Sequence, residues 1–283
     1  ALRAGSASTA SHDPADVSVG TGEDLNVPIP LETGVPGLAA PRRFVLDKIL
    51  VDAAVEAGAQ LREGVSVDGL LRDRDKVTGI RGHTSEGDFE ALGRFVVGAD
   101  GRHSVVARET EAPFVRDHGN TSAGYYTYFR GLPLDGVETY FHDDLFCVVA
   151  PTNDDLTLIG VAWPHDRFGA IRADVEKSFL EALDGLGDIG PRTRAAERVE
   201  RFVGSAELPN YLRKGTGPGW ALVGDACYHK DPAPADGISD AFRAAEYLAE
   251  AIDDALSEGR GSLETTYEER HAEVALPLLD MAL

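Results

Sequence analysis

A strand that leads through a Gly-Asp pair and a proline-rich loop into a long helix is the feature that most constrains this fold. The apolar run 220–224 is typical of a buried strand, and Asp225 follows its end. The loop contains Pro232 and leads to Gly237. Apolar residues then recur at helical spacing, at Ile238, Ala241, Phe242, Ala245, Leu248, Ala249, Ile252 and Leu256. Open α/β sheets bind ligands at the carboxyl ends of their strands, so this segment predicts a binding site. A plain Pro/Gly loop with an Asp cap would have the same features.

A second segment of this kind lies earlier in the chain. Residues 94–98 are typical of a buried strand, and Asp100, Gly101 and Ser104 follow at the start of a polar helix. Gly101 lets the backbone approach a ligand closely, and Asp100 can accept hydrogen bonds in the turn. An ordinary strand-to-helix turn explains this segment equally well.

The rest of the pattern interleaves helices with two kinds of sheet. A helix is expected from about residue 46 to Gly58, and a further helix at 175–186 and a last one at 267–278. The expected strands, bounded by Gly and Asp turns, are 59–62, 65–71, 76–82, 88–92 and several within 123–163. The predicted fold class is therefore α/β with α+β mixing, in which an antiparallel sheet is inserted into a layered domain.

Together these segments resemble the FAD-dependent monooxygenases with the p-hydroxybenzoate-hydroxylase fold and their geranylgeranyl-reductase-like relatives. The resemblance covers roughly residues 41 to 280. The matching positions are Arg43, Leu46, Leu50, Asp100, Gly101, Ser104, Gly224, Asp225 and Gly237. It implies a partial FAD/NAD(P)-binding three-layer domain with an inserted substrate-domain sheet.

The resemblance implies FAD as cofactor and assigns residues to it. Asp225 and Arg43 would hold the ribityl–phosphate part, Asp100 and Gly101 the pyrophosphate side, and the amides near Gly237 the pyrimidine edge. The full set of implied cofactor-binding residues is Arg43, Asp100, Gly101, Gly224, Asp225, Pro232, Gly237 and Ile238. No residue stands out as an acid or base, so no catalytic residue is predicted.

The implied activity is that of an NAD(P)H-dependent monooxygenase that uses O2 to hydroxylate or epoxidise a small organic substrate. Two alternatives stay open: a flavin-dependent reductase of prenyl-type double bonds, and a non-catalytic remnant or binding protein that has lost FAD. The candidates for lining the substrate site are Tyr126, Tyr128, Tyr140, His142 and Trp163. Strand alternation points only half of such residues toward one face, so the interpretation as a core or outer residue is favoured for each of them.

The expected domains follow from this layout. Residues 1–40 are rich in Ala, Gly, Ser, Thr and Pro and are interpreted as an N-terminal extension or loop. Residues 41–118 and 205–283 would form a discontinuous FAD-binding domain. Residues 119–204 would form the substrate-binding sheet domain.

One departure from the resemblance is large: the Gly-rich βαβ unit that grips the ADP half of FAD is missing. Gly20 and Gly22 follow a short apolar run, but Leu25 replaces the third glycine and Pro28 and Pro30 exclude a helix. A truncated chain, recruitment of another chain and loss of flavin are the three explanations. Loss of the unit should expose a hydrophobic sheet edge, which favours self-association into a homo-oligomer.

Composition narrows the remaining classes. The net charge of −21 argues against nucleic acid or an anionic membrane as partner. Cys147 and Cys227 stand without a CxxC or a His at metal spacing, so we expect reduced thiols and no metal. No apolar run is long enough to span a bilayer and no signal pattern is evident, so a cytoplasmic location is predicted.

Overall fold

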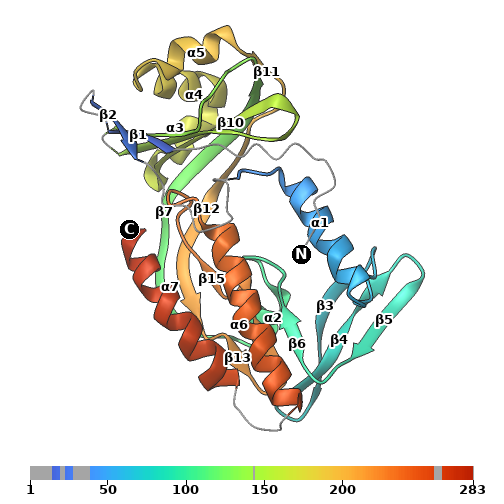
Figure 1. The fold of residues 1–283 in the computed structure, drawn as a ribbon. Coiled ribbons are helices and arrows are strands. Elements are labelled where there is room, and N and C mark those ends of the chain that lie inside the picture. Colours follow the sequence, from blue (N-terminus) through green and yellow to red (C-terminus); the bar gives the residue numbers. More distant parts are fainter. Residues whose placement is uncertain (1–14, 20–22, 28–38, 143, 258–262, 283) are drawn as a thin grey trace. The chain divides into compact units, whose positions relative to one another are not determined.

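The computed structural model describes residues 15–19, 23–27, 39–142, 144–257 and 263–282 (Figure 1). The chain forms two compact units, each assembled from two segments. Unit 1 comprises Ala1–Leu61 and Ser122–Glu207, and unit 2 comprises Arg62–Thr121 and Leu208–Leu283. The fold mixes helices with several sheets, as predicted. The assignment of an FAD-binding and a substrate-binding domain to the predicted ranges stays a proposal.

The centre of unit 1 is an antiparallel sheet. Its strands are β7 (Phe114–Arg130), β10 (Leu156–Pro164), β9 (Leu145–Pro151) and β8 (Val137–His142), paired in that order. These strands confirm the β-rich stretch predicted from about 123 to 163. The short strand β11 (Glu197–Arg198) also pairs with β7.

Two further strands extend this sheet from a segment that was predicted to be a loop. β1 (Ala15–Val19) pairs in parallel with β8, and β2 (Glu23–Val27) pairs antiparallel with β1. The prediction was wrong for these residues because their strand conformation depends on pairing with a distant edge, which local composition does not reveal. β2 includes Asn26, which agrees with the rejection of a helix there.

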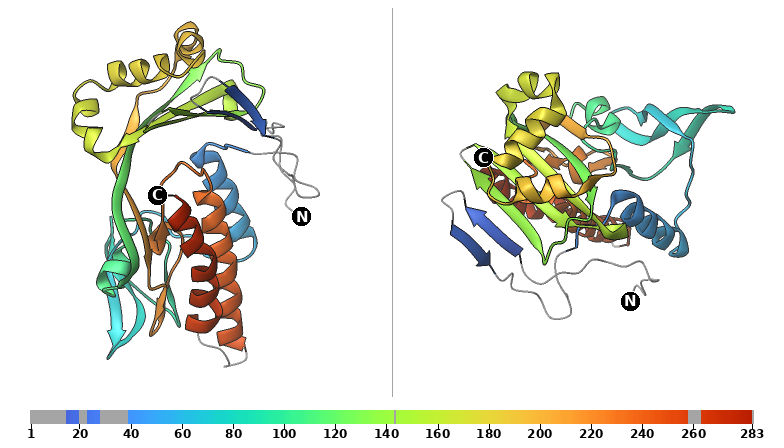
Figure 2. Two further views of the ribbon diagram at one scale, coloured as in Figure 1. Left: turned by 90° about the vertical axis from the view of Figure 1, so that its left-hand side faces the viewer. Right: turned by 90° about the horizontal axis from the view of Figure 1, so that it is seen from above.

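Three short helices cover one face of the unit 1 sheet (Figures 1 and 2). They are α3 (Phe168–Ala173), α4 (Val175–Asp184) and α5 (Ile189–Ala195). α4 is the predicted helix, and its N-cap Asp174 accepts a hydrogen bond from the backbone N–H of Lys177 at 3.1 Å. α5 was not predicted, because Gly190 and Pro191 in its first turn conceal a helical pattern.

The predicted first helix is α1 (Arg43–Glu56), and Gly58 follows it at φ +102°. None of its residues is buried in the structure described. Its exposed apolar side chains are Phe44, Ile49, Leu50, Val51 and Val55. The strand predicted at 59–62 is absent from the described chain; this stretch is irregular, since no strand described lies beside it to pair with.

Unit 2 contains two small sheets. β3 (Ser66–Asp73), β4 (Lys76–Thr84) and β5 (Gly87–Leu92) form the predicted antiparallel meander. β6 (Val96–Gly98) pairs in parallel with β14 (Trp220–Leu222), and β13 (Thr216–Gly217) completes that sheet.

The remaining strands are β12 (Val203–Arg213) and β15 (Tyr228–His229). β12 was not predicted; Pro209 inside it and Gly204 near its start weaken the strand signal. Single helical turns lie at Asn153–Asp155, His165–Arg167 and Gly224–Ala226, with a π-turn at Glu264–Glu268.

The helices of unit 2 are α2 (Val105–Glu109), α6 (Gly237–Ser257) and α7 (Glu269–Met281). α6 and α7 lie side by side (Figures 1 and 2). Tyr267, which is fully buried, belongs to the cluster that joins α6 to β14, together with Ala221, Ala244, Leu248, Ala251 and Leu263. This packing fixes the start of α6 close to the end of β14.

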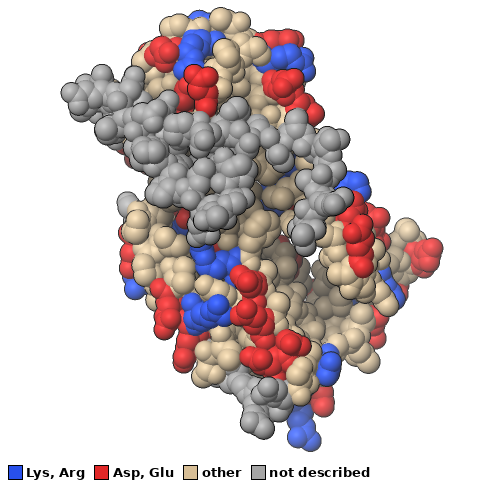
Figure 3. All heavy atoms as spheres, viewed as in Figure 1, with Lys and Arg blue, Asp and Glu red and all other residues tan. Residues whose placement is uncertain are grey.

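The described helices include none that is both long and apolar enough to cross a membrane. Within the same residues, His, Cys, Asp and Glu form no group of three or more that could hold a metal ion. Figure 3 shows one face of the molecule. Where described residues form its surface, acidic and basic side chains are interspersed, and the basic ones form no continuous patch.

Candidate functional site

Two neighbouring parallel strands bring the two predicted motifs to the same edge of a sheet. β6 pairs with β14 so that Gly98 lies opposite Leu222, and the N–H of Val223 donates to the carbonyl of Gly98 at 3.0 Å. Asp100 and Asp225 therefore both follow the carboxyl ends of adjacent parallel strands. This is where α/β sheets bind their ligands.

The segment after β14 turns sharply. Gly224 has φ +60°, a left-handed conformation that glycine adopts at little cost, and it begins a single helical turn. The hydroxyl of Tyr211 donates to the carbonyl of Asp225 at 2.5 Å. The side chain of Asp225 is exposed, and no partner is found for its carboxylate among the described residues.

A buried amide holds the loop that contains Pro232. Asn210, which is fully buried, accepts a hydrogen bond from the N–H of Asp231 at 2.6 Å and donates to Thr121 Oγ1 at 2.8 Å. Asp231 Oδ1 in turn accepts from the N–H of Ala233 at 3.0 Å. No local pattern pointed to Asn210, because its partners are distant in the chain.

The loop ends at the exposed first turn of α6. Pro232, Gly237 and Ile238 are exposed, and a Cβ built on Gly237 would meet no atom within 4 Å. The N–H of Asp240 donates to the carbonyl of Asp236 at 2.9 Å. Within the described part of the chain, the N–H groups of residues 237–239 have no acceptor. Free N–H groups at a helix start favour an anionic group.

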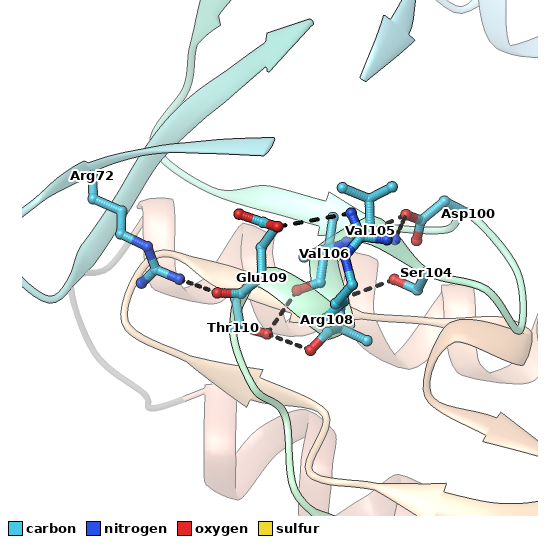
Figure 4. A network of polar contacts seen from close by, with 9 residues as sticks. Arg72, Asp100, Ser104, Val105, Val106, Arg108, Glu109 and Thr110 are labelled. Atoms are coloured by element: carbon cyan, nitrogen blue, oxygen red, sulfur yellow. Dashed lines mark hydrogen bonds and ion pairs between the residues drawn. The ribbon is translucent and has the colours of Figure 1, made fainter. Parts of the chain in front are cut away.

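The Asp100 segment forms a capped turn (Figure 4). Asp100 Oδ2 accepts from the N–H of Val105 at 2.7 Å, and Ser104 Oγ accepts from the N–H of Ala107 at 2.9 Å. Gly101 has φ +76°, with open space where a Cβ would stand. One Asp100 oxygen therefore caps α2, and contact of Asp100 or Gly101 with a pyrophosphate stays a prediction.

The far end of α2 is also tied down (Figure 4). Arg72 Nη2 donates to the carbonyl of Glu109 at 2.5 Å, and Thr110 Oγ1 donates to the carbonyl of Val106 at 2.8 Å.

Arg43 is the one predicted cofactor residue that lies in unit 1, so it is not placed relative to the others. Its side chain is 71% exposed, and Nε lies 3.0 Å from Asp47 Oδ1. The structure brings Gly224, Asp225, Pro232, Gly237 and Ile238 into one loop–helix segment, with Asp100 and Gly101 on the neighbouring strand end.

Arg42, which the sequence did not single out from Arg43, is held firmly within unit 1. Its guanidinium lies 4.2 Å from the ring centroid of Tyr128 and forms an ion pair with Glu200. Its backbone N–H donates to Asn153 Oδ1 at 2.9 Å. Burial raises the pKa of Tyr128.

The five residues predicted to line the substrate site lie on both faces of the unit 1 sheet. Tyr126 and Tyr128 lie opposite Gly160 and Leu158 of β10, on the face away from α3–α5. Tyr140 and Trp163 pack in the core under those helices, and their burial removes them from the predicted lining. His142 is exposed at the end of β8. Alternation alone could not decide which face the helices cover.

The thiol of Cys227 and the ring of His271 lie together in the core of unit 2, 4.0 Å apart between Sγ and Nδ1. Burial raises the pKa of Cys227 to about 12 and lowers that of His271 to about 4. Both groups are therefore neutral at pH 7 and suited to packing rather than to catalysis.

The model of the FAD binding domain family matches residues 43–282. This chain belongs to that family. The match begins at Arg43 and includes both strand-end motifs and all of α6, so it agrees with the predicted resemblance.

The chain is similar to curated proteins of known name. The digeranylgeranylglycerophospholipid reductase of Methanosarcina acetivorans is 27% identical to it over 253 residues, which cover 85% of this chain and 60% of the relative. Digeranylgeranylglycerophospholipid reductase 1 of Methanopyrus kandleri is 28% identical over 235 residues, 80% and 60% of the two chains. The chain thus spans about 60% of the length of these relatives.

Solved structures show the same fold. A flavin-dependent brominase has a TM-score of 0.83 at 18% identity, covering 95% of this chain and 70% of its own. The p-nitrophenol 4-monooxygenase of Pseudomonas putida has a TM-score of 0.79 at 17% identity, covering 97% and 72%. At these identities the likeness concerns the fold alone.

Proposed function

We propose that this chain is part of an FAD-dependent oxidoreductase that reduces prenyl-type double bonds. The observation that carries the use of FAD is the shared sheet edge, where Asp100–Gly101 and Gly224–Asp225 follow adjacent parallel strands beside the free first turn of α6. The family match supports FAD. The reductases among the curated relatives favour the reduction of prenyl groups over hydroxylation.

The described residues fit the flavin half of FAD. Backbone space is open at Gly101 and Gly237, and the N–H groups of residues 237–239 have no acceptor among these residues. These amides would hold the anionic pyrimidine edge, which the positive end of the α6 dipole favours. Asp225 would accept hydrogen bonds from the ribityl hydroxyls, and the contact of Arg43 with the phosphate side stays a prediction from the sequence. When bound, FAD supplies the redox chemistry.

The substrate would bind on the face of the unit 1 sheet that lies away from α3–α5. Tyr126 and Tyr128 lie on that face with Leu158, and Phe141 is 44% exposed on the same side of β8. Such an apolar and aromatic surface suits an isoprenoid chain and keeps water from the reacting bond. Of the predicted lining, Tyr126 and Tyr128 stay in this proposal; His142 pairs with Leu145 on the face that α3–α5 cover and is left out of it.

A monooxygenase is the second candidate, favoured by the fold shared with p-nitrophenol 4-monooxygenase. It would use NAD(P)H and O2 on a small organic substrate. NAD(P)H as the electron donor, a cytoplasmic location and self-association also stay predictions.

The test is FAD retention followed by single-turnover oxidation. We expect the purified chain to keep flavin absorbance after incubation with FAD and gel filtration, and an Asp225→Asn variant to keep less. After reduction by dithionite without O2, a digeranylgeranyl glycerophospholipid should reoxidise the flavin and lose one double bond for each reduced flavin, since each carries two electrons. Reoxidation only with O2, together with a hydroxylated product, would support the monooxygenase instead. A chain that stays colourless would contradict both.

A further inference from the structure

A buried lysine lies in the loop that leads into α6. Lys230 is 7% exposed, and its Nζ forms ion pairs with Asp240 and, at 2.6 Å, with Asp236 Oδ1. Asp240 is also 7% exposed, and its Oδ1 accepts from Arg243 Nη1 at 2.8 Å. One buried cation thus joins two carboxylates on either side of the helix start.

The contacts of Lys230 span the whole loop. Asp236 immediately precedes Gly237, and its carbonyl accepts the N–H of Asp240 at 2.9 Å. The Nζ–Asp236 contact is close but is not aligned as a hydrogen bond, so its contribution is mainly the attraction of the charges. Ala235, with φ +57°, is held in a conformation that non-glycine residues seldom adopt. Lys230 therefore connects the turn that contains Ala235 to the helix start through Asp236 and Asp240.

The charges in this cluster balance. Lys230 and Arg243 carry two positive charges, and Asp236 and Asp240 carry two negative ones. Without Lys230, a net negative charge would remain at the first turn of α6, and Asp240 would be a buried carboxylate with a single, partly exposed partner. That charge would reduce the positive potential that the first turn of α6 offers an anionic ligand, and the buried carboxylate would lose its main partner.

We infer that Lys230 is a positioning residue, which holds the first turn of α6 and neutralises its carboxylates so that the amides of residues 237–239 bind the anionic edge of a flavin. The inference rests on the proposed function. Lys230 does not touch the flavin in this arrangement; it acts through Asp236 and Asp240.

The positioning can be measured without flavin. Hydrogen exchange of the Asp240 amide reports the bond to the Asp236 carbonyl. We expect this exchange to quicken about fivefold or more in Lys230→Met, because the buried Asp240 loses its partner and the first turn opens more often. Asp236→Asn should quicken it too, and the double variant should add little. Lys177→Met, which removes an exposed lysine from α4, is the matched control and should leave it unchanged.

The consequence for flavin is measured on the FAD-loaded chain. Lys230→Met should bind FAD about fivefold more weakly, and the midpoint potential of the flavin should become more negative, because its anionic reduced form loses stabilisation. Lys230→Arg, which keeps the charge, should restore much of the potential. If Lys230→Met does not fold, Lys230→Gln, whose amide can still donate a hydrogen bond to Asp240 but carries no charge, should show the same shift.

The outcomes separate the two claims. Unchanged Asp240 exchange in Lys230→Met overturns the positioning role. A wild-type chain that retains FAD, with a potential unaffected by Lys230→Met, overturns the role toward flavin while the proposed function stands. A wild-type chain that retains no FAD contradicts the proposed function and, with it, the role of Lys230 toward flavin.

Discussion

The hydroxyl of Tyr267 donates a hydrogen bond of 2.7 Å to the carbonyl of Leu222, the last residue of β14. Both side chains are fully buried, and the Tyr267 ring stacks on His271 with centroids 5.4 Å apart. This bond ties the segment before α7 to the strand that presents Gly224 and Asp225. The geometry of the strand end thus depends on Tyr267, which lies 45 positions further along the chain.

Tyr267→Phe should lower stability without altering the fold. It removes the donor and leaves the Leu222 carbonyl buried without that partner, a loss of about 1–2 kcal/mol. Urea unfolding followed by circular dichroism measures it. Tyr126→Phe, at a half-exposed residue, serves as control and should change stability by less than about 0.5 kcal/mol. Equal effects of the two variants would contradict the prediction.

Ser104→Ala should destabilise α2 by about 1 kcal/mol, because Ser104 Oγ caps the N–H of Ala107 at 2.9 Å. The same substitution at Ser85, in an exposed turn, should have little effect. Thermal unfolding compares them. A drop in stability confined to Ser85→Ala would show that the cap contributes nothing.

His271 should make stability depend on pH. Burial lowers its pKa in the folded protein from the ordinary 6.5 to about 4, whereas the unfolded chain keeps the ordinary value. Above about 6.5 both states are neutral and stability is complete. As pH falls from there toward 4, the unfolded state binds a proton that the folded state excludes, and stability falls.

The expected loss from His271 is about 2 kcal/mol at roughly pH 5. His271→Gln should reduce the slope of stability against pH between about 5 and 6.5. Most carboxylates titrate below this range, so they contribute little to the slope there. His83→Gln, at an exposed histidine, should leave most of the slope in place. Urea midpoints at several pH values decide it; identical slopes in wild type and His271→Gln would refute the prediction.

The neighbouring residues Arg42 and Arg43 should behave oppositely. Arg42→Ala should cost about 1–2 kcal/mol, since it removes the ion pair with Glu200 and the contact with the Tyr128 ring. Arg43→Ala should change stability by less than about 0.5 kcal/mol, because its pair with Asp47 is exposed. If Arg43 holds FAD as predicted, Arg43→Ala should keep the stability of the wild type and bind FAD more weakly in a fluorescence titration. Arg42→Ala should not show this combination, because it loses stability.

Both cysteines should be unreactive in the folded protein. Burial raises the pKa of Cys147 and of Cys227, so neither forms the thiolate near pH 7. A thiol reagent such as DTNB should label neither thiol in buffer, and should label both in urea. Rapid labelling of the native chain would show that one of them opens to solvent.

The sequence by itself determined the elements whose signals are local. The meander β3–β4–β5, the strands predicted within 123–163 and the helix α6 follow from periodicities within each segment, because backbone geometry repeats every two or 3.6 residues. The Gly-Asp turn before α6 was also visible, since Gly224 occupies a conformation that few other residues accept.

Only the tertiary structure decided which residues meet. β1 is a strand because the edge of β8 lies beside it, and Tyr140 is a core residue because helices cover its face of the sheet. Lys230 and Asn210 hold the loop before α6 through partners that no periodicity connects to them. Burial and long-range pairing depend on the packing of distant segments, whereas a local pattern specifies only that a strand has two faces and a helix one apolar side.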